Sequence, residues 1–187
     1  QIQGMVGLKS LPDEFTDKSD VVAYSVPFMS AVNVFFNNSS PLLADKTLRR
    51  ALVQATDVAS IRESLQFETI AVDSPFLRSH FAYNADKTQL AFDQQAARDS
   101  LDEAGWVIND EGLREKDGVL LRIRLVSQSL SEYATIAQRL QSNWVQIGVK
   151  TDVVLQPEED IQLNALSRHD YDALLYGVSI GYDPDVF

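Results

Sequence analysis

The chain has 187 residues, of which 45% are hydrophobic and 23% are charged, and it contains no cysteine. This length and composition are those of one globular domain, or of one lobe of a larger protein. Without cysteine, the chain forms neither disulfides nor thiolate metal sites. The formal net charge of −11 repels nucleic-acid backbones and anionic membranes, which argues against nucleic acid as a partner.

The sequence carries no targeting signal that would place the protein. No run reaches the roughly 20 apolar residues of a transmembrane helix. The first ten residues lack the basic start and apolar core of a secretory signal. The chain begins without methionine and stops abruptly after an aspartate-rich turn, so we expect it to be a piece of a longer polypeptide. The missing signal therefore says little about location.

Residues 1–30 are polar and weakly patterned, and we predict that they form a leading segment before a main α/β body of residues 31–187. The whole chain is predicted to be a single lobe. β-branched and aromatic residues predict short strands at 21–26 and 32–37.

Two helices follow a proline-marked turn. Asp45 is placed to cap the first, in which apolar residues recur at helical spacing: Leu48, Ala51, Leu52 and Ala55. Asp57 is placed to cap the second, over 58–65. Arg49, at the edge of the apolar stripe, is expected to form a structural ion pair rather than an anion site. The stretch 67–90 has no clear period, which predicts a long ordered loop.

Turn signals divide the next part of the chain. Asp93 is placed to cap a helix over 94–104 that Gly105 closes. Two closely spaced turns then predict a small hairpin that begins at 113–115. Alternating apolar residues predict one strand over 119–126 with a single well-buried face.

The rest of the chain alternates helix and strand. Ser131 is placed to cap the longest helix, a strand follows at 151–155, and Pro157 opens a helix. That helix is expected to bury three residues: Ile161, Ala165 and Leu166. The stretch 171–178 is apolar on both faces, as in a central strand. This order predicts an α/β fold with a mixed, largely parallel sheet flanked by helices.

One motif suggests catalysis. Gly177-Val178-Ser179-Ile180-Gly181 matches the G-x-S-x-G nucleophile elbow and follows a buried strand, so a serine hydrolase using Ser179 is the alternative function. Pro184 opposes the helix that should follow. The histidine of that triad comes after the serine in the chain, whereas His80 and His169 both precede it. We therefore predict no catalytic residue and no enzyme activity.

The acidic clusters do not predict a metal site. Glu158-Glu159-Asp160 fits the first turn of a helix, where acidic residues are favourable. Asp183-x-Asp185 lacks the spacing and glycine of a calcium loop. We predict neither a metal nor a cofactor.

Four segments in the correct order resemble one family. They are FFNNSSPLLADKTLRRALVQATDVASI (35–61), YNADKTQLAFDQQAARDSLDEAGW (83–106), IAQRLQSNWVQIGVKTDVV (136–154) and YDALLYGVSIGYDPDVF (171–187). The chain resembles the C-terminal lobe of the extracytoplasmic substrate-binding proteins of peptide/nickel-type ABC transporters. This is solute-binding protein family 5, which includes the oligopeptide- and dipeptide-binding proteins.

The resemblance implies a periplasmic-binding-protein-like fold of two lobes that close over a solute by a hinge motion. This chain would be one lobe, and its partners would be a peptide or other small solute, the missing N-terminal lobe of the same chain and an ABC permease in the membrane. The implied location is extracytoplasmic and bacterial, either periplasmic or as a cell-surface lipoprotein.

The resemblance also points to a ligand site at the end of the last strand. Solutes bind beyond the carboxyl ends of strands in open α/β sheets. The predicted ligand-binding residues lie there: Tyr176, Gly177, Ser179, Ile180, Tyr182 and Asp183. Peptide binders of the family often place Trp and Asp just before the Asp-Pro turn, and 177–181 has neither. We therefore expect a bulkier or less charged ligand than a free peptide amine.

Overall fold

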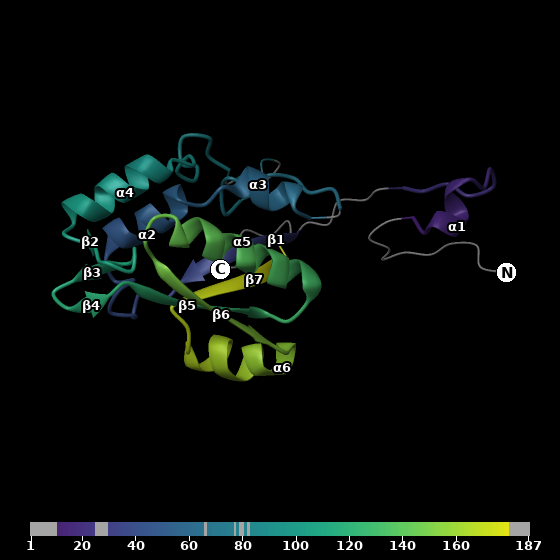
Figure 1. The fold of residues 1–187 in the computed structure, drawn as a ribbon. Helices are drawn as coiled ribbons and strands as arrows, with labels where there is room; N and C mark the ends of the chain where they lie inside the picture. Colours follow the sequence, from purple (N-terminus) through teal and green to yellow (C-terminus); the bar gives the residue numbers. More distant parts are fainter. Residues whose placement is uncertain are drawn as a thin grey trace.

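The computed structural model describes residues 11–24, 30–65, 67–76, 78, 81 and 83–179. Its centre is a four-stranded sheet in the order β1-β7-β5-β6 (Figure 1). These strands are β1 (Ser30–Phe36), β5 (Arg122–Gln128), β6 (Lys150–Gln156) and β7 (Ala173–Ser179). Strand β5 pairs in parallel with β6 and β7, whereas β1 pairs with β7 in the antiparallel direction. The prediction of a mixed, largely parallel sheet is confirmed.

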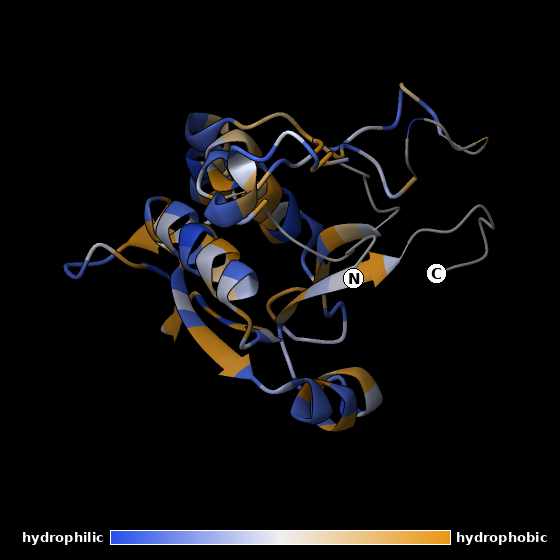
Figure 2. Ribbon diagram, turned by 90° about the vertical axis from the view of Figure 1, so that its right-hand side faces the viewer, coloured by the Kyte–Doolittle hydropathy of each residue, from blue (hydrophilic) through white to orange (hydrophobic). Residues whose placement is uncertain are grey.

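Helices cover both faces of the sheet. Helix α5 (Ser131–Val145) lies on one face, and α6 (Glu158–Asp160), which continues as the π-helix η1 (Ile161–Leu166), lies on the other (Figures 1 and 2). Helices α2 (Lys46–Gln54), α3 (Val58–Glu63) and α4 (Gln94–Glu103) lie on the α5 side. Helix α1 (Asp13–Thr16) lies apart from the sheet in Figure 1. Each face therefore has its own apolar core.

The larger core fills the space between the sheet, α5 and α2. Trp144 of α5 is almost fully buried, and its indole Nε1 donates to the Leu52 carbonyl and to Thr56 Oγ1, both at 3.1 Å. Its ring lies 6.3 Å from that of Phe36 in β1. The predicted stripe of α2 is completely buried here: Leu48, Ala51, Leu52 and Ala55. One tryptophan thus ties α5 to both α2 and the sheet.

Three aspartates begin helices as predicted. The side chains of Asp45, Asp57 and Asp93 accept hydrogen bonds from Thr47 N, Ser60 N and Ala96 N at 2.7, 3.0 and 2.9 Å. The prediction that Ser131 caps α5 is wrong. Leu130 occupies the cap position without a side-chain bond, and the Ser131 hydroxyl donates to Glu132 instead.

The predicted strand over 119–126 is in fact two strands in different sheets. Strand β4 (Val119–Leu120) completes a small sheet with β2 (Val107–Ile108) and β3 (Arg114–Lys116), and β5 begins after Leu121. The turn before β4 has positive φ at Asp117 and Gly118, which folds β4 back on β3. Leu121 N then bonds to Arg114 O, while Leu121 O accepts from Lys150 N, so Leu121 links the two sheets.

Three further expectations need correction. Residues 21–24 form no strand, and 25–26 lie outside the described residues. Leu166 is 37% exposed, because it is the last residue of η1 and only Ile161 and Ala165 reach the sheet. Arg49 donates to the carbonyls of Leu43 and Ala44 at 2.6 and 3.0 Å, so it stabilises the turn before α2 through hydrogen bonds rather than through an ion pair.

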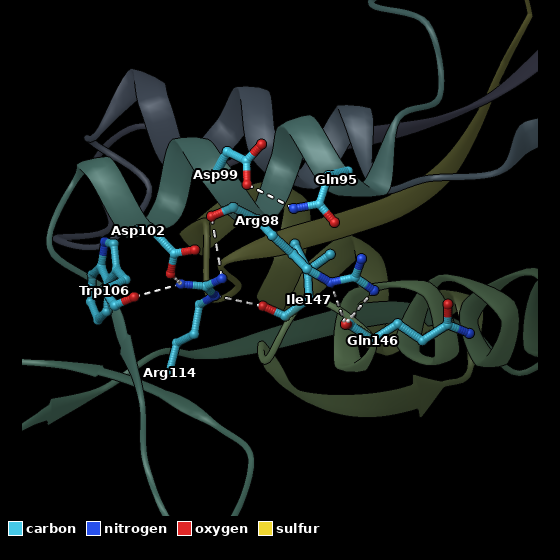
Figure 3. A network of polar contacts seen from close by, with 8 residues as sticks. All are labelled: Gln95, Arg98, Asp99, Asp102, Trp106, Arg114, Gln146 and Ile147. Atoms are coloured by element: carbon cyan, nitrogen blue, oxygen red, sulfur yellow. Dashed lines mark hydrogen bonds and ion pairs between the residues drawn. The ribbon is translucent and has the colours of Figure 1, made fainter.

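A buried arginine joins the small sheet to α4 and to the end of α5 (Figure 3). The Arg114 side chain is only 2% exposed. Its guanidinium donates to four acceptors: Ile147 O at 2.8 Å, Trp106 O at 2.5 Å, Asp102 Oδ1 at 2.5 Å and Arg98 O at 3.2 Å. Three of these acceptors are backbone carbonyls. Those of Ile147 and Trp106 lie just beyond the ends of α5 and α4, and that of Arg98 lies within α4, so Arg114 holds α4, the end of α5 and the small sheet together.

Candidate ligand-binding edge

One edge of the main sheet contains the described residues among those predicted to bind ligand, Tyr176, Gly177 and Ser179. The parallel strands β5, β6 and β7 all end there, and the antiparallel strand β1 begins there, with Ser30 opposite Ser179. Helices α5 and α6 also start at this edge, because each follows its strand after a short turn. We call this the ligand edge. It contains residues 30–33, 127–133, 155–158 and 176–179.

The described part of the predicted site lies on β7 and alternates between the two faces of the sheet. Tyr176 is half-buried and packs with the smaller core under η1. Gly177 faces α5, and Ser179 is exposed at the end of the strand. Ile180, Tyr182 and Asp183 lie outside the described residues, so their placement stays a prediction.

Tyr133, in the first turn of α5, closes the α5 face of the ligand edge. A Cβ atom built on Gly177 would lie 2.3 Å from the Tyr133 hydroxyl oxygen, which is far inside a normal contact. Only glycine therefore fits at position 177 while the tyrosine holds this position. From the sequence alone, the helical spacing of Tyr133, Ile136 and Leu140 indicates one buried helix face and gives Tyr133 no separate role. The available signal was that Tyr133 follows a predicted strand closely and that Gly177 lies near the end of another predicted parallel strand.

The Tyr133 hydroxyl is held in its neutral form. Burial raises the pKa of Tyr133, and the charges of Glu132, Tyr176 and Glu158 raise it further. Hydrogen bonding with the backbone of Gly177 lowers the pKa, but this effect is smaller than that of burial. At neutral pH the ligand edge thus presents a protonated phenol in this position.

We expect Tyr133 to ionise above pH 10, the ordinary tyrosine value. Because the folded-state pKa is raised, this group stabilises the fold below about pH 10, and the contribution is lost as the pH rises through the folded value. The measurement is the difference in phenolate absorbance between the full-length protein and its Tyr133→Phe variant across alkaline pH. A difference curve with its midpoint at or below the ordinary tyrosine pKa of 10 would contradict a raised pKa for Tyr133.

Comparison with known proteins decides the family. Residues 2–187 match the family described as "Bacterial extracellular solute-binding proteins, family 5 Middle". The chain belongs to this family. Its members are solute-binding proteins rather than enzymes, which agrees with the expected absence of a catalytic centre.

Relatives of this family 5 chain are considerably longer. The oligopeptide-binding protein AppA of Bacillus subtilis is 28% identical over 166 residues, which is 85% of this chain but 30% of AppA. The structure of AppA with a nonapeptide has a TM-score of 0.78 at 25% identity, covering 84% of this chain and 32% of AppA. NikZ of Campylobacter jejuni, in complex with Ni(L-His), has a TM-score of 0.73 at 29% identity, covering 85% and 31%. The chain thus spans about a third of these relatives.

The fold does not support the hydrolase alternative for this family 5 chain. Ser179 is the last residue of strand β7 and still pairs with Ser30, whereas a nucleophile elbow needs the serine on a sharp turn between strand and helix. His169 precedes β7, so the length of that strand, roughly 20 Å, separates it from Ser179. His80 lies outside the described residues. The described residues and the family therefore give no support to a hydrolase that uses Ser179.

A recess at the opposite edge of the sheet belongs to the scaffold. Its volume is about 310 Å³, and its lining includes Asn37, Arg124 and Asp172. The Asn37 amide donates to the His169 and Tyr171 carbonyls, both at 3.1 Å. Asp172 accepts from Ser40 Oγ at 2.6 Å and Arg124 N at 2.9 Å. These bonds lock the turn after β1 against the chain that enters β7.

Neither metal clusters nor membrane helices are found in the described part of the chain. No three histidine, aspartate or glutamate side chains of residues 11–179, outside the gaps given above, are grouped as metal ligands would be. Among the same residues, no helix has the length and apolar character needed to cross a bilayer.

Proposed function

We propose that the full-length protein is the extracytoplasmic receptor of an ABC importer, and that these residues form one of its two solute-binding lobes. The observation that carries this proposal is the family match over residues 2–187, together with a sheet whose strand ends and helix starts meet at one edge. A second lobe of the same polypeptide would face this edge, and closure of the two lobes would enclose the solute. The closed receptor would then dock on a membrane permease.

Two solute classes are suggested by the relatives. The AppA structure holds a nonapeptide, and the NikZ structure holds Ni(L-His). In this chain 177–179, the described part of the stretch before the Asp-Pro turn, offers a glycine, a valine and a serine and no charged group. A solute that presents uncharged surface to this lobe fits that composition better than one bound through an ammonium group. We therefore propose a peptide-like or other small neutral solute.

Ligand-induced closure of the full-length protein tests this function. We expect one solute pool, whether capped peptides, neutral oligosaccharides, free peptides or nickel with histidine, to raise the melting temperature and to reduce the radius of gyration measured by small-angle X-ray scattering. At a hundredfold excess over Kd, binding stabilises a protein by about 2.7 kcal/mol. Stabilisation without compaction would contradict hinge closure. A protein that responds to no pool in either measurement would contradict the receptor function.

A further inference from the structure

Four uncharged polar side chains form a row across the whole sheet at the ligand edge. Asn33 of β1 pairs with Tyr176 of β7, and Gln128 of β5 pairs with Gln156 of β6. Between these pairs, β5 and β7 run in parallel with Ser127 opposite Leu175, so Gln128 and Tyr176 are the next residues of the same ladder. We call Asn33, Tyr176, Gln128 and Gln156 the polar row.

The polar row lies on the face that η1 covers. Side chains alternate along a strand, so residues two positions apart share a face. Two positions away from the polar row, towards the centre of the sheet, the same face is apolar and forms the smaller core: Phe35, Leu174, Val126 and Val154. Ile161 and Ala165 of η1 pack on that apolar row. The face thus changes from apolar to polar within one step as it reaches the ligand edge.

The two glutamines of the row lack hydrogen-bond partners among the described residues, although Gln128 is buried and Gln156, a partly buried residue, has a fully buried amide oxygen. Gln128 is only 8% exposed, and its amide makes no hydrogen bond with any residue that the structure describes. The Oε1 atom of Gln156 is fully buried and also has no partner in that part of the chain. Buried amides without partners are rare because their desolvation is unfavourable, so each needs an explanation.

The other two members add polar groups beside these amides. The Asn33 amide donates to the Ala31 carbonyl of its own strand at 3.4 Å, which is a long bond and leaves the side-chain oxygen available. Tyr176 contributes a phenol that can donate and accept. The row therefore combines donors and acceptors and carries no charge.

We propose that the polar row is a hydrogen-bonding subsite for neutral donor–acceptor groups of the solute, namely amides or hydroxyls. This inference rests on the proposed receptor function. Glutamine and asparagine amides each offer an N–H donor and a carbonyl acceptor, so a row of them matches groups that also do both. A carboxylate or an ammonium would instead require an opposite charge in the row. Peptide backbones and oligosaccharides both carry the matching chemistry.

The test uses the full-length protein and three solute pools: N-acetylated, C-amidated peptides, neutral oligosaccharides, and a charged pool of free peptides with nickel–histidine. Gln128→Met and Gln156→Met remove each amide while keeping length and volume close. Gln138→Met makes the same change at an exposed position on α5 and serves as the control. Retained solutes are identified by mass spectrometry after rapid gel filtration, and the melting temperature of each unliganded protein is recorded.

We expect the wild type to retain members of one neutral pool, and that pool identifies whether amides or hydroxyls are bound. Retention should fall about tenfold in each row variant, as expected when one polar partner is lost, and should not change in the control. The unliganded row variants should melt at the same temperature as the wild type or higher, because an unpartnered amide has been removed.

Several results would overturn the inference and leave the receptor function intact. The first is that the row variants retain as much solute as the wild type, and the second is that the wild type retains the charged pool alone. The third is that the unliganded row variants melt several degrees lower than the wild type, which would show a structural role for the amides. A wild-type protein that retains nothing from any of the three pools would count against the receptor function itself.

Discussion

Replacing Arg114 with methionine is expected to destabilise the region around α4 and the small sheet by about 3–5 kcal/mol. The Asp102 carboxylate is 58% exposed, so the ion pair itself contributes little. Most of the effect comes from the carbonyls of Ile147 and Trp106, which lose a buried donor. Each unsatisfied buried acceptor costs about 1–3 kcal/mol.

Hydrogen exchange of the full-length protein measures this change locally, since unfolding of a multi-lobed protein is not a two-state process. Exchange in α4, β2 and β3 should become faster, while β1 and β7 stay protected. Arg122→Met is the matched control. Arg122 also pairs with an aspartate, Asp152, but its side chain is 59% exposed, so its loss should change hydrogen exchange little. Equal effects of the two substitutions would show that burial of Arg114 is not what makes it important.

Adding a single methyl group at position 177 is expected to disturb the ligand edge. In Gly177→Ala the new Cβ would lie 2.3 Å from the Tyr133 hydroxyl oxygen, so the ring must move. Overpacking of this kind costs about 1–3 kcal/mol. Because Tyr133 closes one face of the edge, the displaced ring should also weaken solute binding to the full-length protein.

The partner substitution should reverse this effect. Without the hydroxyl, the nearest Tyr133 atom to the new Cβ is Cζ at 3.5 Å, which is an ordinary contact. The double variant Gly177→Ala with Tyr133→Phe should therefore be more stable than Gly177→Ala alone, and a double-mutant cycle of melting temperatures and affinities measures the coupling. Additive effects of the two substitutions would mean that the two residues do not touch in solution.

Local signals in the sequence predicted much of the fold. Asp45, Asp57 and Asp93 begin helices because a cap needs only a side chain and an N–H two or three residues away. Gly105 and Gly148 end helices with φ of +84° and +83°, which glycine adopts without strain. The apolar stretch 171–178 predicted a central strand, and β7 lies between β1 and β5.

Contacts between distant segments were not predictable in the same way. Arg114 is one charged residue in a short hairpin, and only the folded chain shows the carbonyls that surround it. The chain divides into β4 and β5 at Leu121 because β4 pairs with β3. The alternation of apolar residues does not specify this pairing.

The ligand edge was predicted as a region but not in its details. The end of β7 was found through the rule that solutes bind beyond strand ends and through the family resemblance. Tyr176 was predicted, but Tyr133 and the other members of the polar row were missed, because their positions depend on the register between strands and on where α5 begins. A shift of one residue in any strand would turn these side chains to the other face.

In the receptor that we propose, the antiparallel pairing of β1 with β7 would determine how this lobe joins the rest of the chain. Ser30 lies opposite Ser179, so the polypeptide enters and leaves the α/β body at neighbouring points of one edge. A unit of this kind can be inserted into a surface loop of another domain with little change to the path of the host chain. It can also swing on its two adjacent connections without breaking its own sheet. The β1–β7 pairing would therefore allow the α/β body to be inserted into another domain and to rotate as a rigid unit about its two adjacent connections.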